Sequence, residues 1–251
     1  MKPFIIAEFA SCHMGSLTKA IDGIITAHSA GAQAFKVQYW SSPERMRSRR
    51  RVPAPAYEQG SVPAEWHATL KKECHDRGLL YSASVFLPED VAVLAPHVDY
   101  WKVSSFEARD RELTRLIPRD TRTLFISTGM QTAHDESYLP RTGIRLHCVS
   151  AYPCPPYEAN LGAIERGQGY SDHTRCVFTG AFAVSAGADY LEVHYRLADT
   201  PASCPDYVVS LDPDGLQKYI GLAREAYKMR GDGRKVPQVS EQGSLAHRVT
   251  S

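Results

Sequence analysis

The chain has 251 residues, of which 43% are hydrophobic and 23% charged, enough apolar material for one large domain or two small ones. Its 29 Lys and Arg residues nearly balance 28 Asp and Glu residues, which argues against a dedicated nucleic-acid-binding domain because such domains usually carry a basic excess. The apolar fraction excludes a disordered chain, and the 17 Gly and 16 Pro residues show no period that would indicate collagen or low complexity.

The start of the chain and its cysteines favour a cytoplasmic protein. Glu8 interrupts the first apolar run too early for a secretion signal, and no window approaches the roughly 18 apolar residues of a membrane span. None of the six cysteines forms a CxxC pair, which argues against a zinc ribbon or a thioredoxin-like site. We therefore expect reduced, mostly structural thiols and no membrane partner.

Short runs rich in Ile, Val, Phe and Tyr recur along the chain and predict buried parallel strands. The predicted strands are Phe4–Ala10, Ala34–Trp40, Leu79–Phe86, Tyr100–Ser105, Thr123–Gly129, Ile144–Ala151, Gly167–Ser171 and Tyr190–Leu197. Helix signals lie between these runs. Ser16 is predicted to cap a helix that stops at Gly31, and Pro63 and Gly78 are predicted to bracket a second helix.

Two more long helices are predicted within residues 174–188 and 211–230, whereas the helices after the third to sixth strands are expected to be shorter. Eight β/α units in about 250 residues are typical of a single (β/α)8 TIM barrel. A doubly wound open sheet is the alternative, because periodicity does not show whether a sheet closes. We expect a barrel over residues 1–230, a polar tail over 231–251, and an irregular, arginine-rich segment over 41–60.

Polar residues gather at the predicted carboxyl ends of the strands, where barrel enzymes have their active sites. Lys36 and Lys102 lie within apolar strands, and a buried lysine is costly unless an anion pairs with it. Several serines follow the same strands, so a bound phosphate or carboxylate would satisfy both lysines. The alternative is that Glu8, Glu107 or Glu192 pairs with the lysines as part of the barrel structure.

His173 and His194 end neighbouring predicted strands, which lie about 4.8 Å apart in a sheet. Two imidazoles so placed can share a divalent ion and leave positions open for water and substrate. Taken singly, each histidine would more often be a hydrogen-bonded structural residue.

Eight phrases carry a resemblance to a known family: AEFASCHMGS, AGAQAFKVQYW, WKVSSFEA, ISTGM, LHCVSAYPCP, GYSDHT, AGADYLEVHY and PDYVVSLDP. They run from residue 7 to about residue 213, in the order found in the N-acetylneuraminate (sialic acid) synthase family, which the chain resembles. GYSDHT followed by ExH is the specific part, and ISTGM supports it. The resemblance implies a transferase of carbohydrate biosynthesis, built on a (β/α)8 barrel.

The resemblance implies condensation of phosphoenolpyruvate with an aldehyde, a sugar or a nucleotide-type acceptor. Carbon 3 of phosphoenolpyruvate attacks the aldehyde, water adds at carbon 2, and phosphate leaves a 2-keto-3-deoxy acid. By the same resemblance, the residues expected to bind phosphoenolpyruvate are Lys36, Lys102, Ser105, Ser127, Ser150 and Ser171. Those expected to contact the acceptor are Gln38, Glu107, Tyr152 and Asp206.

The resemblance also implies that His173 and His194 hold a divalent ion, foremost Mn2+ with Mg2+ or Co2+ as alternatives, which would polarise the aldehyde carbonyl. Glu8 matches a carboxylate near the reacting carbons and is the candidate proton-transfer group. Glu8, His173 and His194 are therefore the expected catalytic residues, and a homodimer is a further expectation.

The chain departs from the family pattern at several positions. Cys12 replaces the usual Asn, Ser150 stands where many members have Asn, and a short insertion before Asp206 weakens the match there. The family's C-terminal antifreeze-like domain is not expected here, which suggests an acceptor other than N-acetylmannosamine. The arginines of the irregular segment would suit a phosphorylated or acidic acceptor, unless they form a solvated loop; they are Arg45, Arg47, Arg49, Arg50 and Arg51.

Two other functions are compatible with such a barrel. One is a metal-dependent aldolase or lyase that releases pyruvate, and the other is a non-catalytic barrel subunit. Lys36, Lys102 and the serines favour a phosphate-bearing donor over the lyase. The intact histidines, lysines and Glu8 argue against a subunit without catalysis.

Overall fold

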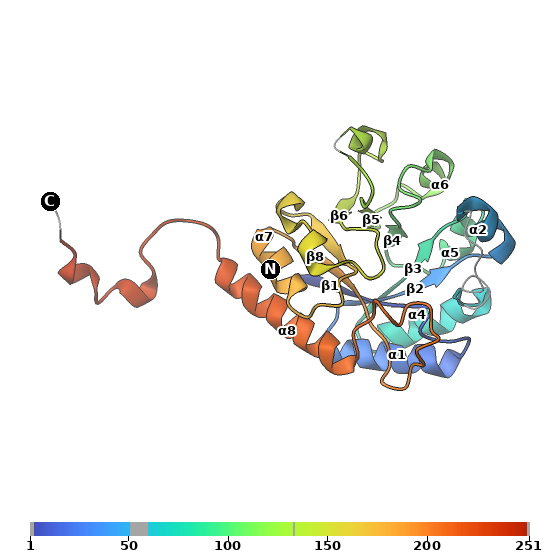
Figure 1. The fold of residues 1–251 in the computed structure, drawn as a ribbon, viewed down its shortest axis with the longest axis horizontal. Helices are drawn as coiled ribbons and strands as arrows, with labels where there is room; N and C mark the ends of the chain where they lie inside the picture. The colour runs from blue at the N-terminus through green and yellow to red at the C-terminus, as the bar shows by residue number, and fades with distance from the viewer. Residues whose placement is uncertain (1–2, 51–59, 133, 250–251) are drawn as a thin grey trace.

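The computed structural model describes residues 3–50, 60–132 and 134–249, and eight parallel strands form a closed barrel in chain order (Figure 1). The strands are β1 (Phe4–Ala10), β2 (Ala34–Tyr39), β3 (Leu80–Val85), β4 (Trp101–Val103), β5 (Leu124–Ser127), β6 (Ile144–His147), β7 (Gly169–Asp172) and β8 (Tyr190–His194). β1 pairs with both β2 and β8, with Glu8 opposite Lys36 on one side and His194 on the other. The TIM barrel is thus confirmed, and the open sheet is wrong.

The long helices begin and end where the sequence predicts. In α1 (Leu17–Ala30) the Ser16 hydroxyl accepts a hydrogen bond from the Lys19 backbone N–H at 3.3 Å, and Gly31 ends the helix at φ 90°. The other predicted long helices form as α4 (His67–His75), α7 (Thr179–Ala186) and α8 (Pro213–Arg230). A 3-10 turn, η1 (Ala64–Trp66), precedes α4.

The helices after the third to sixth strands are short, as predicted. The connections there contain α5 (Asp90–Leu94), α6 (Arg111–Leu116) and the 3-10 turns η2 (Asp135–Tyr138), η3 (Pro156–Glu158) and η4 (Leu161–Ala163). The segment over 41–60 is not irregular throughout, because Pro43–Arg50 forms helix α2. Met46 is the single large apolar residue of α2, so an apolar helical period could not appear in the sequence.

The barrel interior is layered, because alternate residues of each strand point inward. Near the amino ends of the strands, an apolar floor is formed by the buried cluster Ile6, Ala34, Tyr100, Phe125 and Leu146. The next inward-facing layer, closer to the carboxyl ends of the strands, consists of buried polar side chains: Glu8, Lys36, Lys102, Ser127, Ser171 and Glu192. The charged layer therefore stands on an apolar floor, toward the carboxyl ends of the strands.

After α8, residues 231–249 lead away from the barrel (Figure 1) and contain the exposed 3-10 turns η5 (Val239–Glu241) and η6 (Leu245–His247). Within the described ranges, no helix is both long and apolar enough to cross a membrane.

Candidate active site

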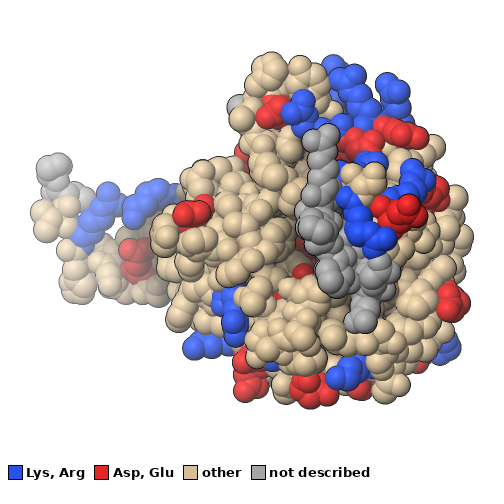
Figure 2. All heavy atoms as spheres, turned by 45° about the vertical axis from the view of Figure 1, so that its right-hand side comes forward, with Lys and Arg blue, Asp and Glu red and all other residues tan. Residues whose placement is uncertain are grey.

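A cavity of about 260 Å³ opens at the carboxyl ends of the strands, directly above the charged layer. Figure 2 shows acidic side chains deep inside a hollow on this face of the molecule. Eleven of the predicted site residues line the cavity: Glu8, Lys36, Gln38, Lys102, Ser105, Ser127, Tyr152, Ser171, His173, His194 and Asp206. Residues far apart in the sequence are brought together because each lies in a barrel strand or in the loop that follows one.

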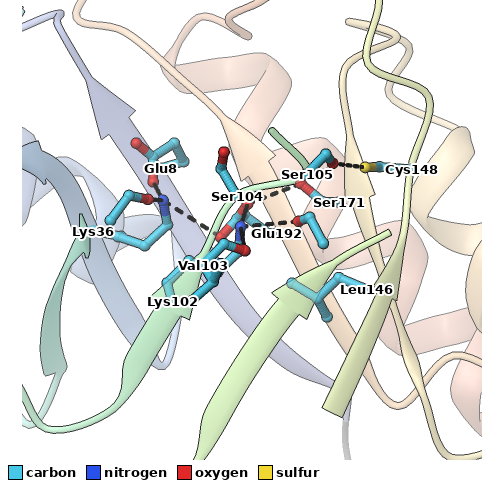
Figure 3. A network of polar contacts seen from close by, with 12 residues as sticks. Glu8, Lys36, Lys102, Val103, Ser104, Ser105, Leu146, Cys148, Ser171 and Glu192 are labelled. Carbon is cyan, nitrogen blue, oxygen red and sulfur yellow. Dashed lines mark hydrogen bonds and ion pairs between the residues drawn. The ribbon is translucent and has the colours of Figure 1, made fainter. Parts of the chain in front are cut away.

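Two lysines and two glutamates form a buried network at the base of this cavity (Figure 3). Lys36 Nζ contacts the carboxyl group of Glu8 and lies 3.5 Å from Glu192 Oε2. Lys102 Nζ lies 3.3 Å from the other oxygen of Glu192. Glu192 therefore bridges the two lysines. The alternative that Glu8 and Glu192 pair with the lysines is thus seen in the structure, and the same lysines also face the cavity that an anion would enter.

Hydroxyl groups complete the network. Lys36 Nζ donates to Ser84 Oγ at 2.6 Å, and Lys102 Nζ donates to Ser127 Oγ at 2.9 Å. Ser171 Oγ donates to Glu192 Oε1 at 2.8 Å. Each lysine thus presents an ammonium whose neighbours are hydroxyls and carboxylates, a set that can rearrange around an entering anion.

The two carboxyl groups have opposite pKa shifts. Burial raises the pKa of Glu8 to about 8, although the charge of Lys36 opposes the rise. Burial also acts on Glu192, but the charges of Lys102 and Lys36 outweigh it and lower the pKa of Glu192 to about 2. Glu192 is therefore the permanent anion of the network, while Glu8 holds a proton near neutral pH.

The histidine rings of the site lie with their centroids 5.5 Å apart and their planes at 60°. Burial lowers the pKa of His173 and of His194 to about 3, so both are neutral at neutral pH. Because the Val149 carbonyl can only accept, His173 Nδ1, 2.7 Å away, must carry the proton, which leaves the lone pair on Nε2. His194 Nδ1 lies 3.9 Å from Asp206 Oδ1.

The side of the cavity next to the histidines carries the predicted acceptor residues. Asp206 accepts hydrogen bonds from the backbone N–H of Ser11, at 3.0 Å, and from its hydroxyl. The Tyr152 ring lies 4.2 Å from that of His173, and 45% of Tyr152 is exposed. Gln38 lies two residues beyond Lys36 on β2, so it faces the cavity above the charged layer.

Two predicted site residues do not line the cavity. Ser150 follows β6, and its hydroxyl packs against Gly129, so close that a Cβ on Gly129 would lie 2.2 Å away. Glu107 is buried behind Ser104, whose hydroxyl donates to it. Both residues lie in loops, where strand alternation does not determine the direction of a side chain.

The sequence analysis named Glu192 only as a structural partner of the lysines, and it did not name Ser84. Both lie on the inward face of their strands, and the alternation that identified Lys36 could have identified them. An apolar wall was also missed; it consists of Trp40, Met46 and Phe86, which line the cavity on the side of β2 and β3.

Of the arginine run, the described side chains Arg45, Arg47 and Arg49 do not line the cavity. Arg45 forms an ion pair with Glu89, and Arg49 forms one with Asp110. Among the described side chains of α2, Met46 lines the cavity. The side chain of Arg50 and the whole of Arg51 lie outside the described residues.

Fold and cavity together define a (β/α)8-barrel enzyme with cationic and hydroxyl groups at the base of its active site. The chain belongs to the NeuB family, whose sequence profile matches residues 23–235. It is 31% identical to a pseudaminic acid synthase of Campylobacter jejuni subsp. jejuni serotype O:23/36 (strain 81-176), over 93% of this chain and 76% of that protein.

Two more similarities cover nearly the whole chain. It is 27% identical to N-acetylneuraminate-9-phosphate synthase of Mus musculus, over 92% of this chain and 72% of that protein. A crystal structure of N-acetylneuraminic acid (sialic acid) synthetase from Leptospira borgpetersenii in complex with citrate matches with a TM-score of 0.89 and 28% identity, over 99% of this chain and 92% of that one. The expected family, the barrel and the class of phosphoenolpyruvate-dependent sugar-acid synthase are confirmed.

Proposed function

We propose that this chain condenses phosphoenolpyruvate with an aldehyde and water, giving a 2-keto-3-deoxy acid and phosphate. The observation that carries the proposal is the pair of buried lysines, Lys36 and Lys102, in one layer at the base of the cavity. A donor with several negative charges needs fixed cations, and ammonium groups beside hydroxyls form strong charge-assisted hydrogen bonds to phosphate and carboxylate.

In this proposal the phosphate and carboxylate of the donor bind to the two lysines and to Ser105, Ser127 and Ser171. Ser105 Oγ accepts a hydrogen bond from the Gly129 N–H at 3.1 Å and lies 3.0 Å from Cys148 Sγ, so its position is fixed. Ser150 packs behind this group, and we propose that it supports the loop after β5.

Glu8 is the proposed proton-transfer group. Its protonated carboxyl donates a proton to the aldehyde oxygen as the new carbon–carbon bond forms. The resulting carboxylate then takes the proton that the water releases when it adds at carbon 2, which restores Glu8 for the next cycle. Glu192 stays ionised and orients both lysines.

His173 and His194 fit a divalent ion, because both are neutral and His173 donates Nδ1–H to a backbone carbonyl, an arrangement common in metal-binding histidines. The described residues hold no group of three or more His, Cys, Asp or Glu side chains able to bind a metal, so the two histidines would leave positions open. Bound there, an ion such as Mn2+, or Mg2+ or Co2+, would polarise the aldehyde carbonyl. Calorimetric binding of Mn2+ should be lost in His194→Ala.

Gln38, Tyr152 and Asp206 are the proposed acceptor contacts, since they line the upper cavity beside the histidines. We also propose residues 1–230 as the catalytic barrel and a cytoplasmic location, which the free state of the six cysteines supports. The homodimer stays a prediction, which light scattering in solution would test.

The direct test measures phosphate released from phosphoenolpyruvate with a panel of aldehydes, together with the mass of the product. We expect phosphate release that requires an aldehyde, and a product three carbons longer than that aldehyde. Release of pyruvate from a keto-acid substrate, with no aldehyde-dependent phosphate release, would instead identify the lyase.

A further inference from the structure

Two cysteines lie side by side where the loop after β1 meets the loop after β8. Cys12 follows β1, and Cys204 lies between β8 and α8, 192 residues further along the chain. Their Sγ atoms are 3.7 Å apart, and both side chains are buried. The closure of the barrel places β1 beside β8 and so brings the two thiols together. We call this pair the loop dithiol.

The loop dithiol touches the groups that hold Asp206 in place. Ser11 donates hydrogen bonds to the Asp206 carboxylate from its hydroxyl and from its backbone N–H, and Ser11 Oγ lies 3.5 Å from Cys204 Sγ. The Ser210 hydroxyl donates to the Asp206 carbonyl at 2.7 Å and lies 3.8 Å from Cys12 Sγ. Each of these two hydroxyls therefore contacts one of the two thiols.

The two thiols differ in acidity. A hydrogen bond with Cys12 lowers the pKa of Cys204, with a smaller effect in the same direction from Ser11, although burial opposes both. The hydrogen bond with Cys204 and burial raise the pKa of Cys12. Oxidants attack the thiolate form of cysteine, and a reactive thiolate next to a second thiol is typical of redox-sensitive sites. Cys204 is therefore suited to react first, and Cys12 to resolve the product.

Little of the chain separates Cys204 from solvent. Its neighbours Ser203 and Pro205 are both exposed, and Pro205 also lines the active-site cavity. This cavity has a volume of about 260 Å³, which is ample for a molecule as small as hydrogen peroxide. A small oxidant can therefore approach the loop dithiol along the exposed turn that contains Cys204.

We propose that Cys12 and Cys204 form a reversible disulfide that weakens binding of the acceptor aldehyde by displacing Asp206. The oxidant is a hydroperoxide, and the reductant is a small thiol. Disulfides in a reducing compartment are usually transient and redox-sensing, which agrees with a bond that forms and breaks. The effect on the acceptor rests on the proposed function, whereas formation of the disulfide does not.

The oxidation proceeds in two balanced steps. The Cys204 thiolate attacks one oxygen of hydrogen peroxide, the O–O bond breaks, and after protonation a sulfenic acid and one water result. Cys12 Sγ then attacks the sulfenic sulfur, the Sγ–Sγ bond forms, and the hydroxyl leaves with the Cys12 proton as a second water. The two thiols together lose two electrons and two protons, which reduce one peroxide to two waters. Two small thiols reverse the change and become a disulfide themselves.

Formation of the bond must disturb Asp206. Bonded sulfur atoms lie about 2.05 Å apart, so the two Sγ atoms have to approach by more than 1 Å. Ser11 is adjacent to Cys12, and Asp206 is two residues beyond Cys204, so both partners of this contact lie on segments that move. A misplacement of about 1 Å can reduce the rate of a reaction by about 10²-fold. Lys36 and Lys102 lie on β2 and β4, away from both loops.

The first test looks for the disulfide itself and does not depend on activity. The reduced protein is treated with hydrogen peroxide, its remaining thiols are alkylated, and it is digested with trypsin for mass spectrometry. We expect the peptide that ends at Lys19 to be joined to peptide 197–218, each of which contains a single cysteine, and dithiothreitol should separate them. Cys12→Ser and Cys204→Ser should each abolish this cross-link.

Cys176→Ser is the matched control, because Cys176 is a partly exposed thiol on another loop, and this variant should form the cross-link like the unaltered chain. Absence of the cross-link at peroxide concentrations that oxidise Cys176 would overturn the inference. A disulfide that joins Cys204 to a cysteine other than Cys12 would overturn it as well.

The second test measures phosphate release by the oxidised and the reduced protein after the peroxide is removed. Oxidation should lower kcat/KM for the aldehyde at least about tenfold, while the KM for phosphoenolpyruvate stays unchanged. Dithiothreitol should restore the activity, and Cys12→Ser should not respond to peroxide. Equal kinetics of the cross-linked and the reduced protein would overturn the effect on the acceptor.

The two tests separate failure of the inference from failure of the proposed function. Absence of phosphate release with every aldehyde in both redox states would remove the proposed function and the effect on the acceptor with it. The cross-link would still decide whether Cys12 and Cys204 form a reversible disulfide.

Discussion

Two carboxyl groups that share Lys36 differ in protonation because their surroundings differ. Both are buried, but Glu192 lies between two ammonium groups, whereas Glu8 contacts only Lys36 and has its pKa raised further by the charge of Glu192. Divergent pKa values of this kind are a mark of acid–base sites. In this site they assign the proton to Glu8 and the fixed negative charge to Glu192.

Lys102→Met should reduce kcat/KM for phosphoenolpyruvate by about 10²- to 10³-fold, since it removes one electrostatic donor from a water-poor site. Glu192 keeps Lys36 as a partner, so we expect the variant to fold. Phosphate release measures the loss, and Lys228→Met on the surface of α8 is the control. An unchanged affinity and turnover would show that Lys102 does not bind the donor.

Activity should depend on the protonation of Glu8. With its pKa raised to about 8, the carboxyl loses its proton above that pH, and kcat/KM should fall about tenfold per pH unit there. Glu8→Gln should be about 10²- to 10⁴-fold slower and should lack this descending limb. A variant that retained the limb would assign the proton transfer to another group.

At the residue scale, strand alternation made much of the site predictable. Lys36, Lys102 and Ser127 point inward because of their place in a strand, and they line the cavity as expected. Ser150 and Glu107 lie in loops after β6 and β4, where the path of the chain decides their direction. The directions of these two side chains therefore needed the three-dimensional structure.

At the element scale, α7 packs so closely on α8 that Gly180 has no room for a side chain. A Cβ there would lie 2.3 Å from the ring of Tyr219. Gly180→Ala should therefore destabilise the protein by about 1–3 kcal/mol, the range for overpacked sites. Urea unfolding measures the change.

Gly221→Ala is the matched control, since Gly221 lies within α8 and has nothing within 4 Å of its would-be Cβ. The exposed helical alanine should stabilise the protein by about 0.5–1 kcal/mol. Equal effects of the two substitutions would mean that the contact between α7 and α8 is looser than described.

The helices differ in how far they could be predicted. α1 combines an N-cap serine, an apolar period and a terminal glycine, so its bounds follow from local signals. α2 has an N-cap serine, Ser42, whose hydroxyl accepts the Arg45 N–H at 3.2 Å, but it has no apolar period. Its contacts come from Met46 and from acids that lie about 40 or more residues away in the chain. Such long-range partners leave no local pattern.

At the scale of the whole molecule, the buried histidines should make the protein sensitive to acid. His173 and His194 have folded-state pKa values of about 3, below their usual value of 6.5, so the unfolded chain binds protons that the folded chain does not. Their contribution to stability is therefore present above pH 6.5 and is lost as the pH falls toward 3. Each histidine contributes up to about 1.4 kcal/mol per pH unit in that window.

Unfolding free energies at several pH values, compared between the unaltered chain and His173→Gln/His194→Gln, measure this contribution. Glu8 acts in the opposite sense between pH 4.5 and 8, because its pKa is raised on folding, but it is common to both proteins. We expect a shallower decline in the double variant. Identical slopes would show that the histidines do not titrate in this way.

The alternation of strands and helices could be predicted from the chain length and from the spacing of the apolar runs, but the closure of the sheet into a barrel could not. Only the pairing of β1 with β8, which joins the two ends of the strand series, distinguishes a barrel from an open sheet. Closure also brings Glu8 beside His194 and so assembles the site from both ends of the chain.

The most direct measurement uses phosphoenolpyruvate labelled with 18O at the oxygen that bridges carbon 2 and phosphorus, together with the most active aldehyde. Addition of water at carbon 2 followed by loss of phosphate breaks the carbon–oxygen bond, so the account predicts that the released phosphate carries the label. Unlabelled phosphate, with 18O retained in the organic product, would contradict it.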